Sequence, residues 1–193
     1  VITNAGGPGI MASDAIEHAG LRLAQLTDET KQTLQAKLPA AASVANPVDV
    51  LGDAYADRYA MAIDHVLADP NVDALMVVLT PQTMTQIPET GEALGTISKK
   101  YGKPVFGCFM GDLAIAEGVQ VLRSHDVPNY QVPERAVKAI AAMRDHRRWL
   151  NTPPLQVETF EANKEKVAAL FAAARADGRV TMGDAEARDV LEA

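Results

Sequence analysis

The sequence lacks a second cysteine, a long apolar run and an excess of positive charge. Cys108 is the only cysteine among 193 residues, which excludes an internal disulfide framework and a zinc site built on several cysteines. The formal net charge of −7 and the isoelectric point near 5.1 argue against a nucleic-acid or anionic-membrane partner, because such partners require a basic surface. Cys108 lies in a predicted strand, which favours a buried and unreactive thiol.

No apolar run reaches the roughly 18–20 residues that span a bilayer. No segment resembles a secretion signal either. We therefore expect a cytoplasmic protein without a membrane partner. The short basic cluster of Arg144, Arg147 and Arg148 is interpreted as the solvated end of a helix, where cations complement the helix dipole.

Histidine is present but lacks the spacing of a metal site. No two of the four histidines form a helical zinc motif, and none lies in a loop that follows a predicted strand. We interpret each as an ordinary surface or helix-end residue, and we predict neither a metal site nor a catalytic residue in this chain. The four are His18, His65, His125 and His146.

What is present is an alternation of apolar strand-like runs with helical segments. A hydrophobic content of 48% is enough for one substantial core. The unbroken apolar run Ala74–Leu79 is typical of a strand buried on both faces of a parallel sheet. The alternation predicts a doubly wound α/β sheet with helices on both faces. About five strands are expected, at residues 1–3, 21–26, 74–79, 105–109 and 127–132.

Helices are expected between and after these strands. They lie at residues 8–20, 27–37, 57–67, 88–101, 112–124 and 133–149. Thr27 and Asp112 are interpreted as residues that begin or cap helices.

A proline-containing linker divides the chain into two predicted domains. Thr152, Pro153 and Pro154 interrupt the alternation, because adjacent prolines stiffen an extended segment. We predict one domain over residues 1–151 and an appendage over residues 152–193. The appendage should hold an alanine-rich helix over Asn163–Ala176 and a further helix from Asp184. Because the chain begins on Val1 within a strand, we expect it to be a piece of a longer polypeptide.

The first fifteen residues predict an anion-binding loop. A strand end is followed by a glycine-rich turn and then by a helix in which Pro8 suits the first turn. Such a loop leaves unpaired backbone N–H groups at the positive end of the helix dipole. The alternative is that the glycines only form a tight turn that lets the helix pack closely. The predicted phosphate-binding residues are Asn4, Ala5, Gly6, Gly7 and Gly9.

Further ligand contacts are expected beyond the carboxyl ends of the strands, where open parallel sheets bind their ligands. The loops Thr80–Thr83 and Met110–Asp112 belong there. Asn46–Asp53 is interpreted as a shaped loop that lies at the same edge of the sheet. For the polar residues of this last loop, the alternative is that they only stabilise their own turn. The candidate ligand residues are Asn46, Asp49, Thr80 and Gln82.

A dinucleotide-binding domain is the alternative reading of the same glycine loop. Gly7, Gly9 and Ala12 fit a G-x-G-x-x-A spacing after a strand. That motif also needs an acidic residue at the end of the second strand. The predicted second strand ends in Gln25, Leu26 and Thr27 instead, which argues against a dinucleotide.

Three stretches together resemble the ADP-forming (NDP-forming) acyl-CoA synthetases, the acetate–CoA ligase relatives of succinyl-CoA synthetase. They are Thr3–Ala15, Asn46–Ala54 and Leu79–Gln82. The resemblance implies that residues 1–151 form a flavodoxin-like, three-layer α/β/α subdomain that follows CoA-binding and phosphohistidine subdomains. It implies that residues 152–193 form the linker and start of an ATP-grasp subdomain.

The resemblance also implies a reaction and a role for the glycine loop. In that family, acid, CoA and ATP interconvert with acyl-CoA, ADP and phosphate through a phosphorylated histidine. That histidine is expected upstream of this chain, and none of the four histidines present matches its motif. The helix that begins at Gly7 and Pro8 is expected to stabilise the phosphohistidine, and free phosphate or sulfate would fit the same place. CoA, ATP or ADP, and Mg²⁺ are the implied cofactors, held mainly outside these residues, so the chain alone should be inactive.

Two other functions stay open at this point. Similar synthetase modules occur fused to acetyltransferase domains, where a non-catalytic, ligand-sensing role is expected. A docking scaffold between active subdomains is the third option. The oligomeric state is left open.

Overall fold

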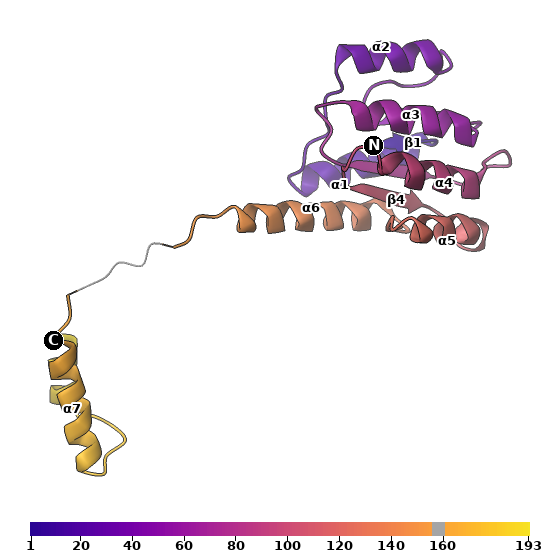
Figure 1. Ribbon diagram of the computed structural model, residues 1–193. Coiled ribbons are helices and arrows are strands. Elements are labelled where there is room, and N and C mark those ends of the chain that lie inside the picture. Colours follow the sequence, from indigo (N-terminus) through magenta and orange to yellow (C-terminus); the bar gives the residue numbers. More distant parts are fainter. Residues whose placement is uncertain (156–160) are drawn as a thin grey trace. The chain divides into compact units, whose positions relative to one another are not determined.

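Parallel strands form one sheet in the part of the chain that the structure describes. The computed structural model (Figure 1) describes residues 1–155 and 161–193. The sheet has the strand order β2-β1-β3-β4, and every pairing is parallel. This confirms the predicted parallel α/β class. The strands are β1 (Ile2–Thr3), β2 (Val48–Asp49), β3 (Leu75–Leu79) and β4 (Val105–Phe109).

The described residues divide into two compact units, Val1–Asn151 and Thr152–Ala193. Helices of the first unit follow the predicted order, although α1 starts before Pro8. Thr27 caps α2 as predicted, since its hydroxyl accepts a hydrogen bond from Thr30 N at 3.3 Å. The helices are α1 (Gly6–His18), α2 (Asp28–Lys37), α3 (Ala56–Ala68), α4 (Ile87–Ser98), the 3₁₀ turn η1 (Leu113–Ile115), α5 (Ala116–Ser124) and α6 (Pro133–Leu150).

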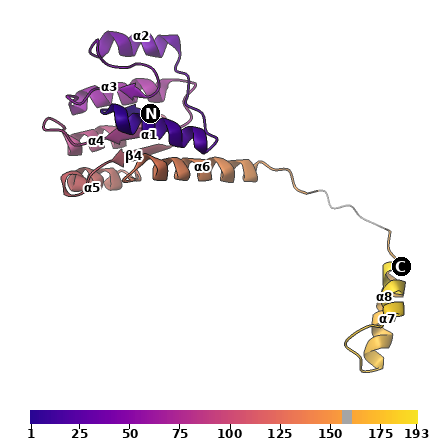
Figure 2. The same ribbon diagram turned by 180° about the vertical axis from the view of Figure 1, so that it is seen from behind.

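β3 lies at the centre of the core, because all of its residues are buried. Alternate residues of a strand face opposite sides of the sheet. Val77 accordingly packs in a hydrophobic cluster with side chains from α2 to α5, and Val78 packs in another with side chains from α1 and α6. Figure 2 brings α1 to the front of the sheet. The first unit is therefore a three-layer α/β/α structure, as predicted.

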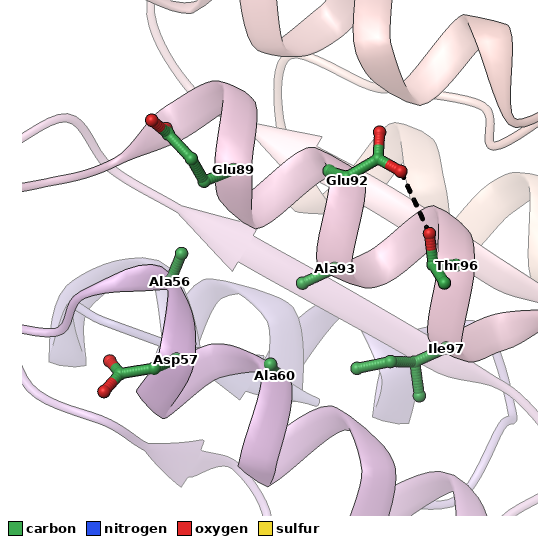
Figure 3. Close-up of a pocket in the computed structure, with 8 residues that line it drawn as sticks. All are labelled: Ala56, Asp57, Ala60, Glu89, Glu92, Ala93, Thr96 and Ile97. Carbon is green, nitrogen blue, oxygen red and sulfur yellow. Dashed lines mark hydrogen bonds between the residues drawn. The ribbon is translucent and has the colours of Figure 1, made fainter.

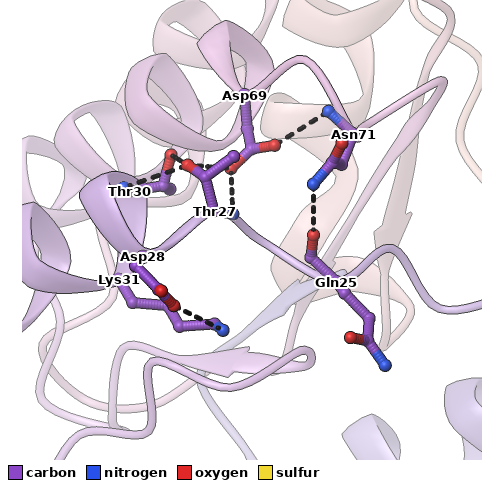
Figure 4. A network of polar contacts seen from close by, with 7 residues as sticks. All are labelled: Gln25, Thr27, Asp28, Thr30, Lys31, Asp69 and Asn71. Carbon is purple, nitrogen blue, oxygen red and sulfur yellow. Dashed lines mark hydrogen bonds and ion pairs between the residues drawn. The ribbon is translucent and has the colours of Figure 1, made fainter.

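The predicted strand at residues 21–26 is wrong. Within the part of the chain that the structure describes, this segment pairs with no strand, and side chains from other parts of the chain bind its backbone instead. Asn46 Nδ2 donates to Ala24 O at 2.9 Å, and Asn71 Nδ2 donates to Gln25 O at 2.8 Å. Figure 4 shows the end of this network, where Asp69 accepts hydrogen bonds from Thr27 N at 2.8 Å and from Asn71 N at 2.9 Å.

The strand beside β1 at the edge of the sheet is β2. It lies inside the stretch that was interpreted as a shaped loop. Val48 pairs with Ile2 and is buried, whereas Asp49 is half-buried. A strand of two residues at the edge of a sheet shows too little alternation to be recognised from its sequence.

The predicted strand at residues 127–132 is reduced to one isolated bridge, between Gly107 and Asn129. Pro128 has no N–H to donate. The Asn129 side chain takes over the next ladder position, where its Oδ1 accepts from Phe109 N at 2.8 Å. The described residues thus hold four strands and two isolated bridges, the second between Ser43 and Asp49, instead of about five strands.

Asp112 stands at the N-cap position of the next helical segment, as predicted, but it does not cap that segment with its side chain. Its side chain makes no capping hydrogen bond, and the segment that follows begins as η1 before it continues as α5. Gly111 precedes it with a φ of +135°, a conformation that favours glycine.

The second unit contains two helices, α7 (Lys164–Ala176) and α8 (Asp184–Leu191). Asn163 caps α7 by accepting a hydrogen bond from Lys166 N at 2.9 Å. The Arg179 guanidinium donates to both carboxylate oxygens of Glu186 at 2.7 Å, and these hydrogen bonds lower the pKa of Glu186 to about 2. In neither unit is any helix of the described residues both long and apolar enough to cross a membrane.

Candidate functional site

The loops that leave the carboxyl ends of the strands contact one another at one edge of the sheet. A Cβ atom on Gly52, in the loop after β2, would lie 3.8 Å from Asn4 O and 3.9 Å from Gln82 Cγ. A Cβ atom on Gly111, after β4, would lie 3.5 Å from Pro81 Cγ. The loops after all four strands therefore form one surface, which we call the carboxyl edge.

Asn4 joins the loops after β1 and β3. Its Nδ2 donates to Thr80 O at 2.8 Å, and its Oδ1 accepts from Thr80 N at 2.9 Å and from Thr80 Oγ1 at 3.1 Å. The Asn4 residue is only 3% exposed. The hydrogen-bonding groups of the Asn4 side chain are therefore occupied by contacts within the protein. Asn4 and Thr80, both predicted site residues, hold the glycine loop in place. Gln82 is exposed at the same edge.

Two backbone N–H groups at the start of α1 have no acceptor within residues 1–155 and 161–193. They belong to Gly6 and Gly7. Ala5, the N-cap residue, provides no side-chain cap, and Pro8 has no N–H. Thr3 Oγ1 accepts from Ala5 N at 3.1 Å and donates to Ala5 O at 2.9 Å, which orders the approach to the helix. The loop thus offers two oriented and unpaired donors.

The three glycines of the loop differ in the space that surrounds them. A Cβ atom on Gly9 would lie 3.1 Å from Thr3 Cγ2, and Gly9 is buried, so close packing of α1 explains this glycine. A Cβ atom on Gly6 or Gly7 would meet nothing within 4 Å, and neither residue has a positive φ. Neither close packing nor a positive φ therefore requires glycine at positions 6 and 7. Glycine at these positions instead leaves the backbone N–H groups accessible to a group from outside the chain.

Electrostatics also set α1 apart at the carboxyl edge. The first turns of α3, α4, α5 and α6 each carry an acidic residue, and the first turn of α1 carries none. Carboxylates in a first turn offset the positive end of a helix dipole. The N-terminus of α1 therefore keeps its attraction for an anion. The acidic residues in the other four helices are Asp57, Glu89, Glu117 and Glu134.

Asn46 and Asp49 are placed differently from the glycine loop. Asn46 precedes β2, at the opposite edge of the sheet, where its Oδ1 accepts from the Val1 nitrogen at 2.9 Å. Asp49 ends β2 at the carboxyl edge, and its Oδ1 accepts from Leu51 N at 2.9 Å. Leu51 has a φ of +71°, so Asp49 stabilises a strained turn. Asp49 thus has the turn-stabilising contact that was weighed as the alternative, whereas Asn46 bonds to Val1 and Ala24, far from its own turn.

Arg58 is a basic side chain at the carboxyl edge that no sequence motif marks. Its Nη1 donates to Val50 O at 2.9 Å and to Asp53 Oδ1 at 2.6 Å. The hydrogen bond from Arg58 lowers the pKa of the Asp53 carboxyl group. From the sequence alone, Arg58 looks like an ordinary surface residue of a helix. Only its hydrogen bonds to Val50 and Asp53, in the preceding loop, distinguish it from other surface residues.

The four histidines lie outside the carboxyl-edge loops. His125 Nε2 lies 2.8 Å from Glu92 Oε2, and the imidazole of His65 lies 2.8 Å from Lys37 Nζ. The described residues contain no group of three or more His, Cys, Asp or Glu side chains that could hold a metal ion. Burial raises the pKa of Cys108 to about 12, in agreement with an unreactive thiol.

A shallow depression of about 370 Å³ between α3 and α4 is a weaker candidate than the glycine loop (Figure 3). Its walls are mostly alanine and carboxylate side chains, and Glu92 is already bonded to Thr96 at 3.0 Å. Nothing in it offers a converging set of donors or a buried polar group without a partner. The glycine loop is therefore the candidate functional site.

A model of the Ligase-CoA domain matches residues 1–155. The chain belongs to this family. The match confirms the resemblance to ADP-forming acyl-CoA synthetases that the sequence indicated.

Named relatives and solved structures support the same family. The chain is 38% identical over 143 residues to acetate–CoA ligase (ADP-forming) I of Archaeoglobus fulgidus, covering 74% of this chain and 20% of that protein. It is 31% identical over 196 residues to 4-hydroxybutyrate–CoA ligase (ADP-forming) of Nitrosopumilus maritimus, covering 100% of this chain and 28% of that protein.

Among solved structures, a Pyrococcus horikoshii OT3 protein aligns with a TM-score of 0.75 and 31% identity, over 78% of this chain and 36% of that one. A dinucleotide-forming acetyl-coenzyme A synthetase 1 of Ca. Korarchaeum cryptofilum, solved with phosphate and ADP, aligns with a TM-score of 0.70 and 32% identity, over 76% of this chain and 32% of that one. The chain thus spans between 20% and 36% of the length of these proteins.

The observed sheet changes the argument about a dinucleotide. The second strand is β2, and it ends in Asp49 instead of in Gln25–Thr27, so the acidic residue is not missing. Asp49 nevertheless lies about twice as far along the chain as the roughly 20 residues that the dinucleotide motif requires. Its carboxylate is also engaged with Leu51. The Ligase-CoA match, which covers the same loop, therefore remains the better account of it.

Proposed function

We propose that this chain is part of an ADP-forming acyl-CoA synthetase, which converts acid, CoA and ATP into acyl-CoA, ADP and phosphate. Residues 1–151 form the flavodoxin-like subdomain, and residues 152–193 form the linker and start of an ATP-grasp subdomain. The names of the relatives support the reaction. Their greater length supports the presence of CoA-binding, phosphohistidine and ATP-grasp subdomains elsewhere in the enzyme.

The observation that carries the proposal is the pair of unpaired N–H groups on Gly6 and Gly7. They lie at a helix N-terminus with no acidic side chain in its first turn and with open space beside both glycines. Oriented backbone donors of this kind stabilise phosphoryl charge without rearrangement during the reaction. In the proposed role, Gly6 and Gly7 donate to the phosphoryl group of a histidine that another domain supplies. Asn4 and Thr80 hold the loop in the geometry that this requires.

CoA and ATP or ADP are the proposed cofactors of the complete enzyme, as the relatives' names and the neighbour solved with phosphate and ADP support. Mg²⁺ is proposed together with the nucleotide, because it neutralises phosphate charge during phosphoryl transfer. The site on this chain consists of neutral N–H donors, which suit a phosphoryl oxygen and not a metal ion. A cytoplasmic location is proposed from the single, buried cysteine, which needs no oxidising compartment.

Titration of the 193-residue chain with inorganic phosphate is expected to shift the backbone amide NMR signals of Gly6 and Gly7 most. Gly9 should shift less, because its N–H already donates to Ala5 O at 3.2 Å. The exposed Gly102, in the turn after α4, serves as the internal control. Shifts confined to the basic residues at 144–148 would contradict an anion site at α1. A complete polypeptide with no histidine-bearing domain would instead favour the ligand-sensing alternative.

A further inference from the structure

The glycine loop is flanked on both sides, because β1 lies between β2 and β3 in the sheet. On the β3 side, the hydrogen bonds between Asn4 and Thr80 hold it. On the β2 side lies the turn at residues 50–53, which we call the β2 turn. A Cβ atom on Gly52 would lie 3.8 Å from Asn4 O, so the β2 turn touches the backbone that leads into the glycine loop.

The β2 turn has a strained backbone. Leu51 has a φ of +71°, a left-handed conformation that is uncommon for any residue other than glycine. Such a conformation costs free energy and persists only where the surrounding contacts enforce it. Asp49 Oδ1 accepts from Leu51 N at 2.9 Å, and Ala54 N donates to Leu51 O at 3.1 Å. These contacts fix both polar groups of the Leu51 backbone and leave the carbonyl group of Val50 to another partner.

Arg58 is the partner of that carbonyl group. Its Nη1 donates to Val50 O at 2.9 Å and to Asp53 Oδ1 at 2.6 Å. Within residues 1–155 and 161–193, its guanidinium group makes no other hydrogen bond. The guanidinium group is therefore committed to the β2 turn. The side chain is only 21% exposed, so it lies against the turn and does not extend into solvent.

The position of Arg58 is unfavourable for a cation. It lies in the first turn of α3, at the positive end of the helix dipole. The exposed Asp53 pairs with it, but a surface ion pair of this kind contributes little. The bond from a charged donor to Val50 O is the stronger reason for an arginine here. Arg58 is also the only lysine or arginine between each strand end and the first turn of the next helix, over residues 4–9, 50–59, 80–90 and 110–119.

We propose that Arg58 is a positioning residue for the reaction at the glycine loop. This inference rests on the proposed function. The bond from Arg58 to Val50 O holds the strained β2 turn against the Asn4 carbonyl group. The direction in which the N–H groups of Gly6 and Gly7 point is set in this way. Small displacements of groups that bind a transition state cost much of the rate, so Arg58 acts on the phosphoryl group without touching it.

The test measures phosphorylation of the histidine in the full-length enzyme with Arg58→Ala. The single-turnover rate with acyl-CoA and phosphate should fall about tenfold or more, because misplaced donors stabilise phosphoryl charge less well. In steady-state kinetics the loss should appear in kcat and leave KM for acyl-CoA unchanged, because another subdomain is proposed to bind CoA. Asp53→Asn removes the ion pair but keeps the bond to Val50 O, so its rate should stay within about twofold of wild type.

Lys103→Ala is the matched control for lost stability. Lys103 Nζ donates to Leu67 O and to Asp69 O, both at 2.7 Å, at the other end of α3. This variant also loses two hydrogen bonds of a basic side chain, but none of them lies near the glycine loop. It should unfold at a lower urea concentration than wild type and still phosphorylate its histidine at the wild-type rate. Equal rates in Arg58→Ala and Lys103→Ala would overturn the proposal.

Leu51→Gly separates a positioning role of Arg58 from a direct effect of its charge. Glycine adopts a positive φ without strain, so the β2 turn needs less support in this variant. The double variant that combines Leu51→Gly with Arg58→Ala should therefore react within about threefold of Leu51→Gly alone. A double variant as slow as Arg58→Ala would mean that the charge itself acts on the reaction, and the proposal would be wrong.

Arg58→Lys takes the place of Arg58→Ala if the latter does not fold. It keeps the charge, but a single ammonium group lacks the planar fork that holds Val50 O and Asp53 together, so phosphorylation should slow about threefold. A wild-type rate in Arg58→Lys would show that the charge is sufficient, against a positioning role.

The proposed function and this inference fail separately. If Gly7→Val slows histidine phosphorylation while Arg58→Ala behaves as Lys103→Ala, the anion site stands and the role of Arg58 is wrong. If the Gly7→Val enzyme phosphorylates its histidine normally, the proposed function itself is wrong.

Discussion

Gly7→Val in the full-length enzyme is expected to slow phosphorylation of the catalytic histidine about 100- to 1,000-fold, or about 2.7–4 kcal/mol. Gly7 lies in the first turn of α1, and a Cβ atom there meets nothing within 4 Å. The valine side chain therefore occupies only the open space that a phosphoryl group needs. The φ of Gly7 is not positive, so a valine at this position adds no backbone strain. Phosphorylation by acyl-CoA and radiolabelled phosphate, measured in a single turnover, provides the rate.

The matched control for this variant is Ala142→Val, which adds the same branched side chain to an exposed position of α6. CoA affinity should be unchanged in both variants, because another subdomain is proposed to bind CoA. Gly7→Ala should have an intermediate rate, since a methyl group fills less of the approach. Phosphorylation of Gly7→Val within a few-fold of wild type, in a folded protein, would mean that Asn4–Gly9 is only a turn.

Asn4→Ala is expected to lower the free energy of unfolding of the chain by about 2–4 kcal/mol. The substitution removes the partner of three polar groups of Thr80: its N–H, its carbonyl oxygen and its hydroxyl. A buried polar group left without a partner costs about 1–3 kcal/mol. Asn4 is 3% exposed, so water has little access to replace it. Urea unfolding, followed by circular dichroism, measures the change in the transition midpoint.

Gln82→Ala is the control at the same edge, because Gln82 is exposed and its contact with Thr80 Oγ1 is long, at 3.5 Å. Its unfolding free energy should change by less than about 0.5 kcal/mol, as is usual for surface substitutions. Asn4→Ala should also weaken the phosphate-induced shifts of Gly6 and Gly7, because the loop loses its attachment to β3. A midpoint for Asn4→Ala no lower than that for Gln82→Ala would show that the Asn4 contacts contribute little.

The elements that the sequence predicted well are those whose signal is local. Leu75–Leu79 is apolar throughout, and a continuous run of this length suits a strand with both faces covered. Thr27 caps α2 as predicted, because a side-chain oxygen at that position binds an N–H only a few residues away. Such contacts form within one segment, so the segment itself specifies them.

The elements that were predicted wrongly depend on distant partners. Residues 21–26 alternate as a half-buried strand would, but Asn46 and Asn71 bind the backbone that a neighbouring strand would otherwise pair with. At residues 127–132, the Asn129 side chain replaces a rung of the ladder. Local alternation describes which side chains are apolar. It does not say which groups bind the backbone.

The sequence by itself determined the α/β class, the order of most helices and the glycine loop that begins α1, because periodicity, turn formers and helix caps act within short segments. The tertiary structure alone decided what each residue of that loop does. Gly9 is required by its approach to Thr3, whereas Gly6 and Gly7 face open space with unpaired N–H groups. It also decided that Asn4 holds Thr80 and that the loops after the four strands contact one another at the carboxyl edge. These relations join residues far apart in the chain, and only the folded sheet brings them together.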